Sequence, residues 1–231
     1  MRTRYTWIAV AVAAVIVAVL VGTSLSGGGE DEGGDEAAAA ILGAQSVESE
    51  LSGLRQSGNE LGDPDAPVEI VEYGDLACPH CKEAAESMIP DVISQLVRTG
   101  EARLVFRPIA FISPSSERGA LGAEAAAEQD AMWSLVTLLY RNQGDERADW
   151  LSDELLEQAV GELGLDVEAW RTDYRSSQIE RRAAERAAAA EADGVEGTPT
   201  FIVRGPGGER MLQGVVGVTE VAEAVAAVGP S

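Results

Sequence analysis

The feature that most constrains the fold of this chain is the run Cys78-Pro79-His80-Cys81, which contains both cysteines and the single histidine of its 231 residues. A short run rich in β-branched residues, Val68 to Tyr73, precedes it and has the length of a buried strand. After it, apolar residues recur at helical spacing from Ala85 to Val97. The two thiols therefore lie where a predicted strand leads into a predicted helix.

Several uses of a CxxC pair are disfavoured by the rest of the chain. A structural zinc site takes four Cys or His ligands, whereas only Cys78, Cys81 and His80 are present. Covalent c-type haem needs a histidine directly after the second cysteine, and that position is Lys82. A static disulfide across so small a loop removes little entropy from the unfolded chain. A CxxC pair between a strand and a helix instead indicates the redox centre of a thioredoxin-like fold.

The predicted helix gives the two cysteines different roles. Pro79 suits the first helical position, because its missing N–H is harmless there, and Pro90 predicts a kink or break further along. Cys78 then lies at the helix N-terminus, where unpaired N–H groups and the positive end of the dipole favour a thiolate. A cationic or hydrogen-bonding His80 would add to this effect. We interpret Cys78 as the nucleophile and Cys81, one turn inside, as the resolving thiol.

Three consecutive segments carry a family resemblance: Gly62 to Pro67, Val68 to Tyr73, and the Cys-Pro-His-Cys motif. Together they resemble the DsbA-like thiol:disulfide oxidoreductases, particularly the membrane-anchored type of Gram-positive bacteria, over roughly residues 60 to 228. A second landmark, Gly197 to Phe201, looks like the cis-proline loop of that family. The resemblance implies that Thr198 and Pro199 pack against the cysteines through a cis peptide bond and bind substrate backbone.

The order of predicted elements matches an α/β, thioredoxin-like fold with an inserted all-helical subdomain, as the resemblance implies. Further strands are expected at Ala102 to Arg107, Thr200 to Val203 and Arg210 to Gln213, and a last helix at Thr219 to Val228. The insertion, at approximately residues 112 to 194, would supply a second wall for a substrate groove. Within it, Ser152 and Asp166 are predicted helix N-caps. Trp133 and Tyr140 lie beside an apolar helical stripe, which we interpret as core packing.

An uncharged run of nineteen residues, Trp7 through Leu25, is long enough to span a bilayer as a helix. Arg2 and Arg4 precede it and acidic residues follow it, so the basic flank marks the amino end as cytoplasmic. A cleaved signal peptide is the alternative, but the run is longer than a typical apolar signal region and no clear Ala-x-Ala site follows. We therefore expect a cytoplasmic stub at residues 1–6 and a retained single-pass anchor in the cell membrane at residues 7–25.

The remaining chain divides by composition. Residues 26–61 are rich in Gly, Ser, Ala and acidic residues, which favours a flexible acidic linker. Residues 62–231 form the expected DsbA-like thioredoxin domain, outside the cytoplasm of a bacterial cell. The net charge of −22 argues against nucleic acid as a partner. No separate dimerisation domain is visible, so we expect a monomer.

Glu72 is the next candidate catalytic residue. It lies six positions before Cys78, on the strand face of Val68 and Ile70, where a core side chain is expected. The resemblance implies a buried acid at this position that assists proton transfer at the resolving thiol. The alternative is that Glu72 points to a solvated edge.

Two features disagree about the direction of the reaction. The Pro79-His80 dipeptide suggests an oxidase that introduces disulfides into exported proteins, whereas a threonine such as Thr198 before the cis-proline also occurs in reductases and isomerases. We give more weight to the dipeptide, because it contacts the thiolate directly. A reductase or isomerase on the same fold remains an alternative.

The expected partners follow from the resemblance. Substrates would be reduced or unfolded exported proteins, and the re-oxidant a quinone-linked thiol oxidase of the membrane, DsbB-like or VKOR-like. No cofactor and no metal site are expected. An alternative of a different class is a non-catalytic module that holds Cu(I) between the thiolates of Cys78 and Cys81.

Overall fold

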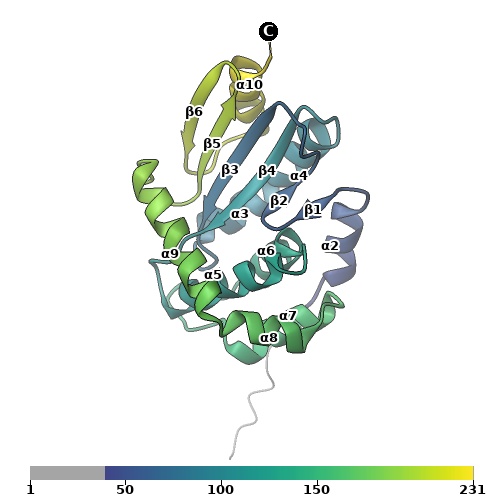
Figure 1. The fold of residues 1–231 in the computed structure, drawn as a ribbon, viewed down its shortest axis with the longest axis vertical. Coiled ribbons are helices and arrows are strands. Elements are labelled where there is room, and N and C mark those ends of the chain that lie inside the picture. Colours follow the sequence, from purple (N-terminus) through teal and green to yellow (C-terminus); the bar gives the residue numbers. More distant parts are fainter. Residues whose placement is uncertain (1–39, 231) are drawn as a thin grey trace, which may run out of the picture. The chain divides into compact units, whose positions relative to one another are not determined.

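The computed structural model describes residues 40–230 of the chain (Figure 1). The predicted stub 1–6, the predicted anchor 7–25 and residues 26–39 of the predicted linker lie outside that range. Among the helices of residues 40–230, none combines the length and the apolar character that crossing a membrane requires.

The strands of residues 40–230 are β1 (Gln56–Ser57), β2 (Glu60–Leu61), β3 (Val68–Gly74), β4 (Ala102–Pro108), β5 (Thr200–Gly205) and β6 (Gly208–Gln213). Within this range they form one six-stranded sheet in the order β1-β2-β4-β3-β5-β6. β3 runs parallel to β4 and antiparallel to β5, so it lies inside the sheet with a neighbour on each side. The predicted strands are confirmed, each within a few residues of its expected bounds.

The helices of the described range are α2 (Ala44–Leu51), α3 (Pro79–Ser87), α4 (Ile89–Val92), the π-helix η1 (Ile93–Val97), α5 (Pro114–Ala127), α6 (Met132–Arg141), α7 (Asp153–Glu162), α8 (Val167–Tyr174), α9 (Ser177–Ala192) and α10 (Val218–Val228). The predicted N-caps are confirmed, because the Ser152 and Asp166 side chains accept backbone N–H groups at the starts of α7 and α8. The predicted break is also confirmed. α3 ends before Met88, and Pro90 lies in the first turn of α4, where its missing N–H is tolerated.

Alternate side chains of β3 pack on opposite faces of the sheet. Val68 and Ile70 belong to the main core, which also contains buried residues of α3, α4, η1, α6 and α10. Val71 and Tyr73 belong to a smaller core on the other face, which includes a residue of α9. Glu72 alternates with Val71 and Tyr73, so it lies on the face that carries the active-site helix.

Between β4 and β5 the chain forms only helices, α5 to α9, which confirms the predicted all-helical insertion. Figure 1 shows α5 to α8 grouped below the sheet, with α9 leading back along its side toward β5. The loop that follows α9 contains Thr198 and Pro199 and enters β5 directly beside β3. The insertion therefore separates the two sequence landmarks along the chain, while the sheet brings them together in space.

The predicted flexible linker at residues 26–61 is wrong from residue 44 onward. This part forms α2 and the β1–β2 hairpin, and β2 extends the sheet by pairing with β4. Val47, Leu51 and Leu61 are buried in the main core. Average composition misled the prediction, because a few apolar residues at helical and strand spacing are enough to dock a short polar segment on an existing core.

Candidate active site

The turn between β3 and α3 is built around the buried carboxylate of Asp75. Its Oδ1 accepts a hydrogen bond from Ala77 N at 2.8 Å, and its Oδ2 accepts one from Phe111 N at 3.1 Å. The backbone carbonyl of Asp75 accepts a hydrogen bond from Cys78 N at 2.9 Å. α3 then begins at Pro79, with Cys78 as its N-cap residue. The predicted position of Cys78 at the helix N-terminus is confirmed, and Asp75 is a supporting residue that the sequence analysis missed.

The loop before β5 contacts the first cysteine. The Thr198–Pro199 peptide bond is cis, and the Cys78 thiol donates a hydrogen bond to the backbone carbonyl oxygen of Thr198, with 3.4 Å between sulfur and oxygen. Thr198 Oγ1 is buried and has no hydrogen-bond partner among residues 40–230. The predicted cis bond facing the cysteines is therefore confirmed. Ionisation of Cys78 would give the buried Thr198 hydroxyl an acceptor.

The surroundings of Cys78 lower the pKa of its thiol to about 6. The largest cause is a hydrogen bond from the Cys81 thiol, and burial opposes it. The Thr198 hydroxyl and the backbone N–H groups of Cys81 and His80 lower the pKa further. At neutral pH Cys78 is therefore mostly a thiolate, which is the form that attacks disulfides.

The structure contradicts the prediction that the side chain of His80 stabilises the Cys78 thiolate. It is 69% exposed, and its Nδ1 lies 3.6 Å from Glu83 Oε2, one turn along α3. The backbone N–H of His80 is the group that helps to lower the Cys78 pKa. This N–H can point toward Cys78 because His80 lies in the first turn of α3, where backbone N–H groups have no partner inside the helix.

Cys81 and Glu72 are both buried. Burial is the largest cause that raises the pKa of Cys81 well above its usual range, and the hydrogen bond to Cys78 raises it further. Glu72 lies between Phe106 of β4 and Phe201 of β5 in the sheet register. Burial raises its pKa to about 8, and its Oε1 has no hydrogen-bond partner among residues 40–230. The predicted core position of Glu72 is confirmed, and at neutral pH this carboxyl group is protonated.

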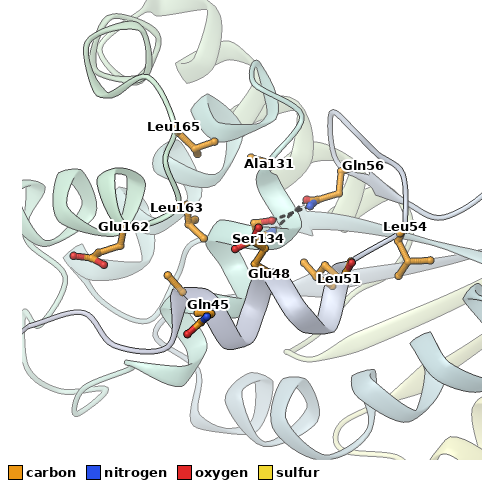
Figure 2. Close-up of a pocket in the computed structure, with 13 residues that line it drawn as sticks. Gln45, Glu48, Leu51, Leu54, Gln56, Ala131, Ser134, Glu162, Leu163 and Leu165 are labelled. Carbon is orange, nitrogen blue, oxygen red and sulfur yellow. Dashed lines mark hydrogen bonds between the residues drawn. The ribbon is translucent and has the colours of Figure 1, made fainter.

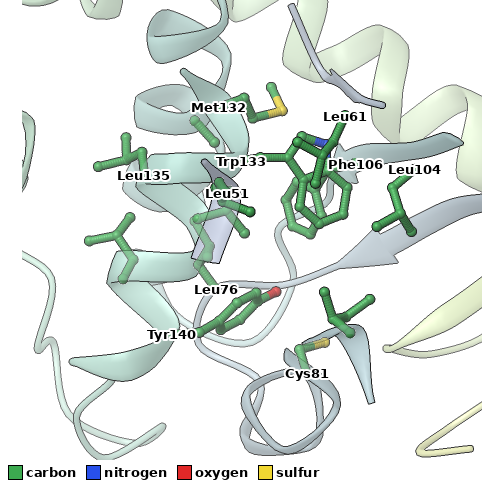
Figure 3. Close-up of a cluster of buried hydrophobic side chains, with 14 of the residues drawn as sticks. Leu51, Leu61, Leu76, Cys81, Leu104, Phe106, Met132, Trp133, Leu135 and Tyr140 are labelled. Carbon is green, nitrogen blue, oxygen red and sulfur yellow. The ribbon is translucent and has the colours of Figure 1, made fainter. Parts of the chain in front are cut away.

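Tyr140, at the end of α6, also reaches this buried group. Its hydroxyl donates a hydrogen bond to the backbone carbonyl of Asp75 at 3.4 Å. Figure 3 shows its ring extending from α6 toward the part of the core that contains Cys81. The sequence analysis assigned Tyr140 to core packing. The helical spacing gave no signal that its hydroxyl contacts the active-site turn.

Gln143 follows α6 in the helical insertion, and its side chain contacts the active-site turn. Its side-chain amide donates to the backbone carbonyl of Leu76 at 2.7 Å and to that of Cys78 at 3.1 Å. These contacts fix the backbone on both sides of the turn. Gln143 was not identified from the sequence, because an isolated polar residue after a helix carries no pattern.

The cavity shown in Figure 2 lies away from the cysteines, between α2, the start of α6 and the segment after α7. Its volume is about 560 Å³, and its polar lining includes Glu48, Glu162 and the hydrogen-bonded pair Gln56 and Ser134. None of the predicted site residues lines it. Within residues 40–230, no group of three or more His, Cys, Asp or Glu side chains is arranged to hold a metal ion.

A smaller cavity, of about 280 Å³, adjoins the cis-proline loop. Thr198 and Pro199 line it together with Glu196 and Gln213. Its position at the loop that contacts Cys78 agrees with the predicted role of this loop in binding substrate, which stays a prediction.

Comparison with known proteins identifies the family of this chain. A family model described as Thioredoxin matches residues 56–210. A Bacillus anthracis protein named "Probable disulfide bond formation protein D" is 30% identical over 172 residues, covering 69% of this chain and 79% of that protein. The chain belongs to the DsbA-like thiol:disulfide oxidoreductases of the thioredoxin family. A Bacillus cereus protein of the same name is 32% identical over 149 residues, covering 63% of this chain and 69% of that protein.

A solved structure shows that the fold is shared. The crystal structure of oxidised BdbD from Bacillus subtilis superposes with a TM-score of 0.66 at 21% identity, covering 74% of this chain and 94% of that one. A thiol:disulfide oxidoreductase needs one thiol that reacts readily and a second that completes the exchange. In this oxidoreductase, Cys78 at the helix terminus and Cys81 inside the core have the contrasting environments that such a division requires.

Proposed function

We propose that this oxidoreductase is an oxidase that introduces disulfides into exported proteins through Cys78 and Cys81. The observation that carries the proposal is the stabilised thiolate of Cys78, whose pKa is about 6. Compared with a free thiol of pKa about 8.5, this favours the reduced enzyme at pH 7 by about tenfold, or ~1.4 kcal/mol and ~30 mV. A more stable reduced form makes the enzyme's disulfide a better oxidant.

The first half of the reaction transfers the disulfide to the substrate. A substrate thiolate attacks the Cys78 sulfur, the Cys78–Cys81 bond breaks, and its electron pair goes to Cys81. A thiolate at this buried position is unfavourable. Glu72, which is protonated at neutral pH, gives its proton to Cys81 and becomes the carboxylate.

The second half releases the product. A second substrate thiolate attacks the substrate sulfur of the mixed disulfide, and Cys78 leaves with the electron pair as a thiolate. Its low pKa makes Cys78 a good leaving group. Thr198 and Pro199 hold the substrate backbone beside Cys78 during both steps.

The proposal also includes the location of the protein in the cell and the enzyme that re-oxidises it. Arg2, Arg4 and the uncharged run at residues 7–25 support a membrane anchor with the catalytic domain outside the cytoplasm. A membrane quinone-linked thiol oxidase, DsbB-like or VKOR-like, would then regenerate the Cys78–Cys81 disulfide. Alkaline carbonate extraction tests the anchor. Release of the protein, or a mature N-terminus near residue 26, would contradict it.

Oxidative refolding tests the function. The oxidised enzyme, added to a reduced and unfolded protein whose activity depends on its disulfides, should restore activity faster than glutathione disulfide does. Cys78→Ser should abolish the effect, and Cys81→Ser should trap a mixed disulfide through Cys78. Rearrangement of wrong disulfides without net oxidation would show that the enzyme is an isomerase instead.

A further inference from the structure

Two segments of the chain meet at the active site. One is the end of β3 with the turn that follows it, from Tyr73 to Cys78, and the other leads from the end of α9 into the cis-proline loop, from Asp193 to Thr198. Cys78 Sγ lies 3.4 Å from the Thr198 carbonyl oxygen. Five residues upstream in each segment, the Tyr73 hydroxyl donates a hydrogen bond to Asp193 Oδ2 at 2.6 Å. The contact at Cys78 is therefore one of two cross-links between the same two segments.

Asp193 is bonded to three neighbouring strands of the sheet. Besides the contact with Tyr73 of β3, its Oδ2 lies 2.9 Å from Arg204 Nη2 of β5 and 3.4 Å from Arg107 Nη1 of β4. Arg107 also donates a hydrogen bond to the Tyr73 hydroxyl at 2.5 Å. Burial acts to raise the pKa of Asp193, but the hydrogen bonds from Tyr73 and Arg204 and the charges of both arginines outweigh it, so the pKa lies below its usual value. At neutral pH Asp193 is therefore a carboxylate that fixes the end of α9 to the sheet.

The chain between Asp193 and Thr198 is four residues long and is supported on both sides. Val195 donates its N–H to a carbonyl in the last turn of α9 at 2.9 Å, and its side chain packs against the smaller core of the sheet. Beyond Thr198, the Thr200 hydroxyl donates to the Gly197 carbonyl at 2.7 Å. Because the segment is so short, a shift of its first residue is passed on to Thr198.

We propose that Asp193 is a positioning residue for the thiol–disulfide exchange, because by fixing the end of α9 to β3, β4 and β5 it holds Thr198 against the Cys78 sulfur. The inference rests on the proposed role of Cys78 as the nucleophile and adds a residue that acts on it through Thr198. The Thr198 hydroxyl is buried and has no hydrogen-bond partner among residues 40–230. It can donate to the Cys78 thiolate only while the loop keeps its place.

Thiolate absorbance of the reduced full-length enzyme, titrated against pH, distinguishes positioning from two other effects of Asp193→Asn. Loss of the negative charge alone would lower the Cys78 pKa, because an anion that opposes the thiolate is removed. A purely structural ion pair would leave the Cys78 pKa unchanged and lower only the free energy of unfolding. Loss of positioning raises the Cys78 pKa, because the Thr198 hydroxyl then donates less well to the thiolate. The sign of the shift therefore identifies the role.

Asp193→Asn should raise the Cys78 pKa by about half a unit, since weakening one hydrogen bond to a thiolate removes part of a contribution on the order of one pKa unit. Tyr73→Phe keeps the charge of Asp193 and removes one of its bonds, so it should shift the pKa in the same direction. In a Thr198→Val background, Asp193→Asn should cause no further rise, because the donor through which it acts is already absent.

Glu157→Gln is the matched control. Glu157 is a carboxylate of the helical insertion, and it accepts hydrogen bonds from Arg171 Nε at 2.6 Å and from Arg171 Nη2 at 2.8 Å. The substitution weakens an ion pair of similar geometry without touching the sheet or the cis-proline loop. It should leave the Cys78 pKa unchanged.

An unchanged or lowered Cys78 pKa in Asp193→Asn or in Tyr73→Phe overturns the proposal, as does an equal rise in the control or an undiminished rise in the Thr198→Val background. If Asp193→Asn does not fold, Tyr73→Phe, in which Asp193 keeps both arginines, decides alone. A thiolate that still titrates at the same low pH in Cys78→Ser contradicts the proposed function instead, because the ionised thiol would not be Cys78.

Discussion

The sulfur of Cys78 and the backbone carbonyl oxygen of Thr198 lie 3.4 Å apart, although 120 positions separate the two residues. The contact joins the helix that begins after β3 to the loop that enters β5. The Thr198 hydroxyl is buried beside it without a partner among residues 40–230, and it contributes to the low pKa of Cys78. Thr198 is therefore the residue of the cis-proline loop most directly coupled to Cys78.

Thr198→Val should raise the Cys78 pKa and make the reduction potential more negative. Loss of the hydroxyl removes a donor to the thiolate, which destabilises the reduced form relative to the disulfide. Each pKa unit corresponds to about 30 mV while the pKa stays below the working pH. Thiolate absorbance against pH and equilibration with glutathione measure the two quantities. Thr198→Ser, which keeps the hydroxyl, is the control, and equal shifts in both variants would contradict this role.

His80→Ala should change the Cys78 pKa by much less than Thr198→Val does. The sequence analysis predicted that the His80 side chain adds to the stabilisation of the thiolate, but the imidazole is exposed and the backbone N–H, which the substitution keeps, makes the contribution. Thiolate absorbance against pH, measured for both variants, tests this prediction. A larger rise of the Cys78 pKa in His80→Ala than in Thr198→Val would show that the imidazole is the main group that stabilises the thiolate.

Glu72→Gln should stabilise the reduced protein, whose two cysteines are free thiols as in this structure, at pH 7 by about 3 kcal/mol, as an upper estimate from a pKa of about 8 in the folded state and about 4.5 in the unfolded state. A raised pKa in the folded state means that stability is greatest below pH 4.5 and is lost as pH rises toward 8. The glutamine does not ionise, so its advantage should grow across this window. Urea unfolding at pH 4.5 and pH 7 measures the difference. A constant difference at both pH values would show that Glu72 is not protonated in the native state.

Removal of residues 1–61 should destabilise the domain by several kcal/mol, whereas removal of residues 1–39 should not. The longer deletion eliminates the buried Val47, Leu51 and Leu61, each worth about 1.5 to 3 kcal/mol. It also removes Asn59, whose backbone carbonyl accepts the Trp133 indole N–H at 3.0 Å. Urea unfolding of the two truncated chains tests this. Equal midpoints would mean that α2 and the hairpin add nothing to stability.

The central part of the site could be predicted because its signals are local. A strand of β-branched residues, a proline after the first cysteine and helical spacing beyond it specify where Cys78 lies. Strand alternation likewise put Glu72 on the core face, which the structure confirms. The cis-proline loop was found through its family resemblance, and its contact with Cys78 follows from the antiparallel pairing of β3 and β5.

The remaining features depend on contacts between distant elements. Tyr140 lies 65 positions after Asp75, and Gln143 lies 67 positions after Leu76, the turn residues to which they donate hydrogen bonds. No rule of sequence spacing relates residues so far apart. The N-terminal hairpin was missed because its strands are two residues each, too short for an alternating pattern. His80 was misjudged because sequence position fixes the backbone N–H but not the direction of the side chain.

The reduction potential of the Cys78–Cys81 pair, measured by equilibration with glutathione at pH 7, tests the central claim most directly. Thioredoxin, with a thiol pKa of about 7, has a potential of about −270 mV. A Cys78 pKa of about 6 favours the reduced form about fivefold more at this pH, which corresponds to ~20 mV. The account therefore predicts a potential of about −250 mV or less negative. A value at or below about −270 mV would contradict the claim that thiolate stabilisation makes this enzyme an oxidant.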